Sequence, residues 1–332
     1  SNLPGNGSII SGLLTFPSNF QFISGTGSGI TLNVGATGPS GVSNATSTSF
    51  SVQKGVATTI SAGAAAPATI SSLETNSLTP VTVFNFNVND DPGGTPANND
   101  DGLPTLLSTV VITANGANNS IADWSQAIAG ASLEDGTNSI NAVTISSNSI
   151  TFSGIPTTIG TLGHVADNAT KNYSLKIYLK SALGGTLPTT IDGLKFEFQM
   201  LESNITLGSN STSIIAAQSS TSGNNNVVDV AATTLRFLSP LAPTSASLNT
   251  DLPGVSVEAV DINNNRDLGF NGASGTVRAL TNPAGATMTN APVVNTTQFS
   301  SGLLNFASNF KFTTGTNGDD VTLTIKAGTG TT

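Results

Sequence analysis

Apolar and polar residues alternate in short runs over most of this chain, a pattern typical of β-strands with one buried face. The clearest run, at 81–88, reads Val-Thr-Val-Phe-Asn-Phe-Asn-Val, with one break in the alternation. Stretches rich in Gly and Pro separate it from similar runs at 106–113, 149–152, 173–179 and 194–200. Because breaks of this kind mark turns, the pattern predicts one large β-sandwich domain over residues 55–201.

One short helix is predicted inside this domain, near residues 120–129. Ser120 is a suitable N-cap residue, and Asp123 follows three positions later, at N3. The apolar residues of the segment would share one face of a helix: Ile121, Trp124, Ala127 and Ile128. Trp124 is therefore expected in the core.

A third unit is predicted over residues 232–332, after a connector rich in Ser and Asn at 202–231. Its short apolar strands are expected at 235–238, 255–260, 275–280, 302–306, 310–313 and 321–326. About 100 residues with six or seven short strands is the immunoglobulin-like pattern, here without a Cys pair. The predicted fold class is all-β, with tandem Ig-like β-sandwich domains.

An internal repeat is the strongest signal in the sequence. Residues 11–22 and 301–312 are identical at nine of twelve positions, at an offset of 290. Residues 1–54 are therefore expected to be the C-terminal part of an Ig-like domain, and residues 232–332 a domain of the same kind without its last strand. The chain is then a window on a longer tandem array. Two homologous domains at the ends of a complete protein are the alternative.

The composition disfavours several classes of partner. The net charge is −9 and charged residues make up 9% of the chain, so nucleic acid and anionic membrane surfaces, which require basic patches, are not expected as partners. No apolar run approaches the roughly 20 residues that span a bilayer, so no membrane insertion is expected within this segment. The absence of Cys fits an exported bacterial protein.

Two groups of motifs resemble known surface proteins. In the third unit, Val-Ser-Val-Glu-Ala-Val-Asp at 255–261 and the Asn-rich 263–265 resemble bacterial Ig-like repeats. In the middle unit, the motifs at 89–91, 100–105 and 151–156 resemble modules of very large Bacteroidota surface proteins, including gliding-motility adhesins. The resemblance implies type IX secretion, a place at the cell surface, and attachment or gliding as the role. The implied partners are neighbouring repeats of the same chain and an extracellular surface or polysaccharide.

The sequence offers little for catalysis. The single His, His164, lies in a predicted turn, and no Gly-x-Ser-x-Gly motif accompanies it as a Ser-His-Asp hydrolase of the α/β type would need. Zinc would require Cys or further His ligands, and no Gly-rich phosphate loop is present. The chain is therefore expected not to be an enzyme.

Calcium is the one predicted cofactor, because clustered carboxylate and amide oxygens suit this ion. One candidate loop, 89–102, supplies Asp90, Asp91, Asp100 and Asp101. A second loop has oxygen ligands at positions 1, 3, 5 and 7 of an EF-hand-like series, although Arg266 stands where Gly is expected at position 6: Asp261, Asn263, Asn265 and Asp267. The alternative is that these residues form turns through bonds from side chain to backbone.

Two other functions remain open beside a stalk or filament segment. The first is a calcium-dependent, secreted carbohydrate-binding module. Tyr173 and Tyr178 are five positions apart, so they should point to opposite faces of a strand and offer no stacking platform together. The second is a subunit of an extracellular filament whose missing strand comes from the next molecule.

Overall fold

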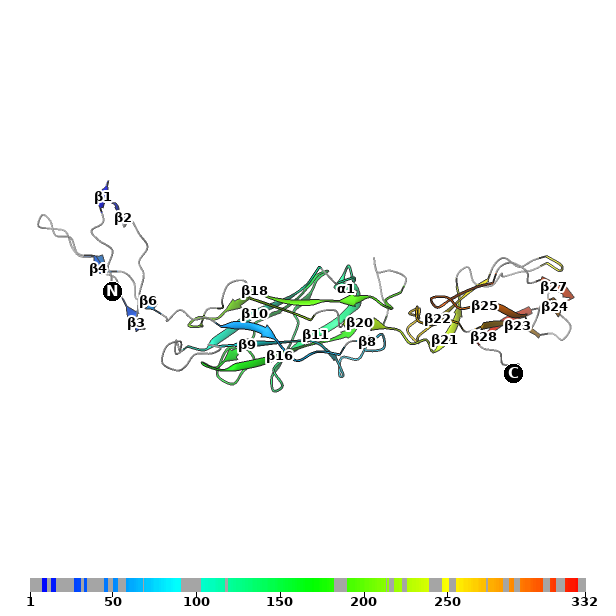
Figure 1. Cartoon of the computed structure of the whole chain (residues 1–332), viewed down its shortest axis with the longest axis horizontal. Coiled ribbons are helices and arrows are strands. Elements are labelled where there is room, and N and C mark those ends of the chain that lie inside the picture. The colour runs from blue at the N-terminus through cyan, green and yellow to red at the C-terminus, as the bar shows by residue number, and fades with distance from the viewer. Residues whose placement is uncertain are drawn as a thin grey trace, which may run out of the picture.

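The protein is an all-β chain in which sheets follow one another along the sequence (Figure 1). The computed structural model describes most of residues 58–272, with gaps at 68, 91–102, 117–118, 182–189, 213, 215–217, 223–225, 239–246 and 251–254. It also describes residues 299–306 and the backbone of further strands towards both ends. In the N-terminal segment these strands pair as β1–β2, β3–β6 and β4–β5: β1 Ser8–Ile10, β2 Leu13–Thr15, β3 Gly27–Ile30, β4 Asn33–Val34, β5 Ala45–Thr46 and β6 Phe50–Val52.

The middle unit contains two large antiparallel sheets. The first has the order β12-β11-β16-β9-β7: β7 Thr59–Ala62, β9 Val81–Asn89, β11 Ile128–Glu134, β12 Ser139–Asn141 and β16 Thr170–Leu179. The second has the order β13-β14-β10-β18-β19, with β15 also paired to β10: β10 Thr105–Ala114, β13 Thr144–Ile145, β14 Ser149–Ser153, β15 His164–Val165, β18 Phe198–Leu207 and β19 Ser219–Thr221. A smaller sheet combines β8 Thr69–Ser71, β17 Lys195–Phe196 and β20 Asn226–Asp229, with β20 and β8 parallel.

The alternation of apolar and polar residues gives this unit a β-sandwich-like core. Every second residue of β16 from Tyr173 to Leu179 is buried, and apolar residues of β9 and β10 belong to the same buried cluster. The ring of Tyr173 stacks on that of Phe86 at 5.2 Å between centroids, and its hydroxyl donates to the Leu162 carbonyl at 2.8 Å. Burial, and secondly the negative charge of Asp135, raises the pKa of Tyr173, so the hydroxyl stays a donor.

The predicted helix is shorter than the sequence indicated. It is a single turn, α1 (Trp124–Ala127), and Ile128 already begins β11. Asp123 is the N-cap and accepts from the Ser125 backbone N–H at 2.9 Å, whereas the Ser120 hydroxyl accepts from the Lys195 N–H at 2.7 Å. The range 120–129 and the Ser120 cap are thus corrected. The apolar face was predicted correctly, since Trp124 and its three apolar companions are buried.

The predicted connector, residues 202–231, is part of the middle unit. Strand β18 continues to Leu207, β19 pairs with β18, and β20 pairs with β17 and β8. Val228 and Val230 are buried in the core of this unit. Strand β20 finds its parallel partner, β8, in a distant part of the sequence, and local composition carries no information about such a pairing.

The third unit has three small sheets, ordered β21-β22-β26, β25-β23-β28 and β24-β27. Its strands are β21 Thr234–Phe237, β22 Val255–Val260, β23 Ser274–Asn282, β24 Thr287–Thr289, β25 Val293–Gln298, β26 Leu303–Phe306, β27 Lys311–Thr314 and β28 Asp320–Ala327. Six of them match the predicted strands within a few residues, and β24 and β25 are additional. In the two copies of the repeated motif, β2 and β26 start at equivalent positions.

Candidate functional site

The second predicted calcium loop lies where the third unit meets the middle unit. This contact is called the joint here, and it comprises Ser72, Thr190 and Asp192 of the middle unit with residues 261–268 of the third unit. In Figure 1, β8 and β20 lie next to β21 and β22 at this point. Only four residues, 230–233, connect β20 to β21.

Asp261 is the centre of the joint. Its side chain is fully buried, and its two carboxylate oxygens accept four hydrogen bonds. One oxygen accepts from the backbone N–H groups of Asn263 at 2.8 Å and Asn265 at 2.9 Å. The other accepts from the Asn265 amide at 2.9 Å and from the Ser72 hydroxyl at 2.6 Å. Asp261 therefore shapes its own loop and also binds the middle unit.

Asp192 makes the reciprocal contact from the middle unit. One of its oxygens accepts from the Val230 N–H at 2.9 Å, and the other accepts from the Leu268 N–H at 2.6 Å. The neighbouring Thr190 hydroxyl donates to the Arg266 carbonyl at 2.5 Å. Hydrogen bonds of backbone donors to a carboxylate are among the stronger ones in proteins. The two units are consequently held by charged and neutral hydrogen bonds from both sides.

The four-residue linker is itself fixed to the third unit. Asp267 accepts from the Ala232 N–H at 2.9 Å, and the Thr233 N–H donates to the Val260 carbonyl at 2.9 Å. With Val230 bound to Asp192, hydrogen bonds hold three of the four linker residues. Rotation of one unit against the other would break several of these bonds together.

The joint loop is supported from inside the third unit by an ion network and by the repeated motif. Buried Glu258 accepts from Arg236 at 2.8 Å and from Arg266 at 3.3 Å. Gly302, part of the Ser-Gly pair that begins both copies of the repeat, has a φ of +69° and lies directly against the loop. A Cβ atom there would be 2.1 Å from the Asp267 carbonyl oxygen, so the site requires glycine.

The predicted calcium ligands of this loop have different roles in the structure. Asp261 and Asn265 contact each other, Asn263 contributes its backbone N–H, and Asp267 faces the linker. Within the described residues, no three His, Cys, Asp or Glu side chains come together as a metal site would need. The hydrogen bonds of Asp261 to the Asn263 and Asn265 N–H groups are those of the alternative, turn-forming role. Calcium binding by this loop stays a prediction.

Of the four predicted calcium ligands in the first loop, the structure describes Asp90. This side chain is buried and accepts from the Thr105 N–H at 2.8 Å and from the Thr58 hydroxyl at 3.4 Å. Asp91, Asp100 and Asp101 lie outside the described residues. Calcium binding by this loop therefore stays a prediction.

A calcium titration tests that prediction. If Asp100 and Asp101 bind the ion, calcium at ten times the Kd should stabilise the protein by about 1.4 kcal/mol through mass action. Calorimetry with calcium and with excess chelator would measure the change in Tm. The double variant Asp100→Asn, Asp101→Asn should abolish the effect, whereas Asn263→Ala in the other loop should retain it. Equal Tm values in calcium and chelator would contradict the prediction.

Sequence reasoning missed the middle-unit half of the joint. Ser72, Thr190 and Asp192 stand in Ser- and Thr-rich stretches that carry no spacing signal. The one usable sign was the Asp192-Gly193 pair, a turn signal whose glycine has a φ of +73°.

Comparison with protein-family models, with curated proteins and with solved structures found no match for this chain. No helix in the described part of the structure has the length and apolar character needed to cross a membrane.

Proposed function

We propose that this chain is a rigid spacer, a stalk segment of a larger extracellular adhesin built from tandem Ig-like β-sandwich units. The observation that carries this proposal is the joint. Asp261 and Asp192 bind across it in opposite directions, and the linker is too short and too well bound to act as a free hinge. A fixed angle between consecutive units is what a spacer needs to hold a distal binding region away from the cell.

The internal repeat extends the argument along the chain. Residues 11–22 repeat the motif in which Gly302 packs against the joint loop. A second copy of the motif supports a second joint of the same kind, one repeat earlier. Arrays in which each unit contacts its neighbours are quasi-one-dimensional, and their stiffness is set by the interfaces between units.

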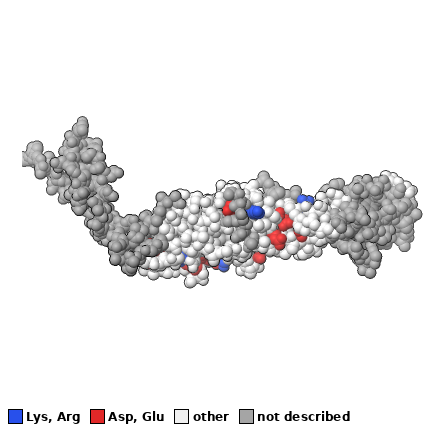
Figure 2. Space-filling view, viewed as in Figure 1, with Lys and Arg blue, Asp and Glu red and all other residues white. Residues whose placement is uncertain are grey.

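The surface chemistry also suits a spacer. Figure 2 shows that the described part of the face in view is mainly uncharged, with small groups of acidic and basic residues. Because salt screens interactions between exposed charges and leaves buried hydrogen bonds largely unaffected, the geometry should depend little on ionic strength. A surface location, type IX secretion and attachment or gliding complete the proposal, and they rest on the motif resemblance. The proposed role requires no catalytic step.

Distance measurement between spin labels tests the rigidity. The chain lacks Cys, so labels can be placed cleanly at exposed Asn172 of the middle unit and exposed Asn305 of the third unit. We expect one narrow distance distribution that is unchanged between low and high salt. Labels at Asn172 and Ser203, both within the middle unit, give the width that the labels alone produce. A distribution across the joint much broader than this control would refute the rigid spacer.

A further inference from the structure

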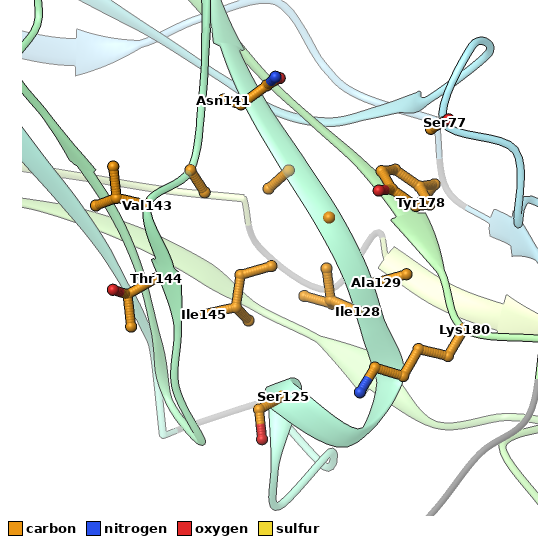
Figure 3. Close-up of a pocket in the computed structure, with 13 residues that line it drawn as sticks. Ser77, Ser125, Ile128, Ala129, Asn141, Val143, Thr144, Ile145, Tyr178 and Lys180 are labelled. Atoms are coloured by element: carbon orange, nitrogen blue, oxygen red, sulfur yellow. The ribbon is translucent and has the colours of Figure 1, made fainter.

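A solvent-open pocket lies on the middle unit and includes none of the joint residues. Its volume is about 640 Å³, within the range of about 300–1,000 Å³ found for small-molecule sites. It lies across β11, with contributions from the end of β16 and from the segment between β12 and β13. The residues that give it its chemistry are Ser77, Ser125, Gly130, Asn141, Tyr178 and Lys180 (Figure 3).

Tyr178 forms one wall because Gly130 has no side chain. A Cβ atom at Gly130 would lie 2.4–2.6 Å from three atoms of the phenol group, so the ring rests directly on the glycine backbone. The other tyrosine of this strand, Tyr173, is buried in the core, which confirms that the two rings lie on opposite faces of β16. In the described part of the chain, no side chain or backbone group hydrogen-bonds the Tyr178 hydroxyl, which leaves it available to a ligand.

The floor of the pocket is made of small residues and backbone. Ala129 lies in a bulge between the β16 partners Ile128 and Gly130, and strand β12 pairs with residues 132–134 of β11. The Ala131 carbonyl is already used by the Ala142 N–H at 2.9 Å. Strand β13, on the other side, is two residues long. These edges are too short and too irregular for an added peptide strand, which needs a continuous ladder.

Lys180 supplies a positive charge at one end. The other two lysines of this strand segment are neutralised, Lys171 by Asp135 at 2.7 Å and Lys176 by Glu134 at 2.6 Å. Among the described residues, Lys180 has no ion-pair partner. Figure 3 shows its ammonium group on the side of Ser125, while Tyr178 and Asn141 lie farther along the pocket.

We propose that this pocket binds a saccharide unit that carries a carboxylate, as in acidic polysaccharides built from uronic acids. The ring of Tyr178 offers an apolar surface for the C–H face of a sugar and a hydroxyl at its edge. Ser77, Ser125 and Asn141 offer neutral donors and acceptors for sugar hydroxyl groups, and Lys180 pairs with the carboxylate. An apolar ligand would leave these polar groups without partners at a cost in affinity.

This assignment goes beyond the spacer function. A pocket on the side of a stalk unit would let the stalk itself hold an acidic polysaccharide at each repeat, and many weak sites in one chain bind with high avidity. A result that refutes one of the two proposals leaves the other unaffected, because the pocket and the joint share no residues.

Calorimetric titration of the full chain with trigalacturonic acid tests the site, with maltotriose as the neutral trisaccharide. We expect the acidic sugar to bind at least tenfold more tightly. Lys180→Gln should weaken that binding about tenfold, and Gly130→Ala, which displaces the Tyr178 ring, should reduce it below detection. Lys176→Gln is the matched control four positions earlier in the chain, and binding should be unchanged because Lys176 is paired outside the pocket.

Four results would overturn the proposal. Trigalacturonic acid could fail to bind at millimolar concentration, or maltotriose could bind as tightly as trigalacturonic acid does. Sodium acetate could displace trigalacturonic acid at an equal concentration, or Lys180→Gln could bind it as tightly as the wild type does. Acetate has the carboxylate without the ring, so it separates a sugar site from simple charge attraction. Lys180 is half-buried and its backbone N–H bond to the Ala127 carbonyl does not depend on its side chain, so Lys180→Gln should leave the fold intact. The result for this variant therefore remains decisive even if Gly130→Ala lowers stability.

Discussion

The variant Asp261→Ala is expected to uncouple the third unit from the middle unit. The substitution removes a fully buried carboxylate that accepts four hydrogen bonds, one of them from Ser72 across the joint. Buried donors left without an acceptor cost about 1–3 kcal/mol each. We therefore expect a loss of about 3–5 kcal/mol in the free energy of unfolding, the upper end for single substitutions.

Calorimetry should show this loss as a change in cooperativity. The third unit of Asp261→Ala should unfold in its own transition, at lower temperature than the middle unit. The spin-label distance between Asn172 and Asn305 should broaden in the same variant. Asn263→Ala is the control in the same loop, because Asp261 binds its backbone N–H, which the substitution keeps. If the two variants behave alike, the Asp261 carboxylate does not hold the joint.

The strands were predictable where apolar residues alternate. Residues 81–88 became β9 (Val81–Asn89), because one face of this strand packs on the core and the pattern reports that burial directly. The helix was predicted too long because both Ser120 and Asp123 are suitable N-cap residues, and the sequence does not show which of them caps it. Asp123 reaches the Ser125 N–H and starts the helix late, and β11 takes over at Ile128.

The joint was not predictable, since its partners are far apart in the sequence. Ser72 and Asp261 are 189 positions apart, and Asp192 and Leu268 are 76 apart. The spacing of oxygen ligands in residues 261–267 favours both a calcium loop and a turn. The described structure shows the hydrogen bonds of the turn, and the same loop geometry brings Asp261 against the middle unit. Composition within a loop indicates such turns, but it carries no information about what the loop will contact.

Asp135→Ala is expected to have a comparable effect within the middle unit. Its carboxylate lies 2.7 Å from the Lys171 ammonium group, and the two side chains are 4% and 18% exposed. Removing one partner of a buried ion pair costs about 3–5 kcal/mol. The Lys171 ammonium group would keep its bonds to the Thr161 and His164 carbonyl oxygens, so we expect a loss near the lower end of this range. Asp135 also accepts backbone N–H groups of Thr137 and Asn138, so the β11–β12 turn loses its anchor.

The pH dependence of the free energy of unfolding shows whether Asp135 stabilises the protein through its charge or through packing alone. Burial by itself would raise the pKa of Asp135, but the Lys171 ammonium and the donors of Asn138 and Thr137 outweigh it and hold the pKa well below its usual range. A carboxyl group with a lowered folded-state pKa stabilises the protein fully above its unfolded pKa of about 3.9, and this contribution is lost as the pH falls further.

The difference in free energy of unfolding between wild type and Asp135→Ala should therefore be constant from about pH 5 to pH 8 and shrink below about pH 4. Urea unfolding at several pH values measures it. Glu134→Ala is the neighbouring control, because the pair of Glu134 with Lys176 is 23% and 31% exposed and should contribute about 1 kcal/mol or less. A constant difference down to pH 2 would mean that Asp135 acts through packing and turn geometry, with no stabilising charge.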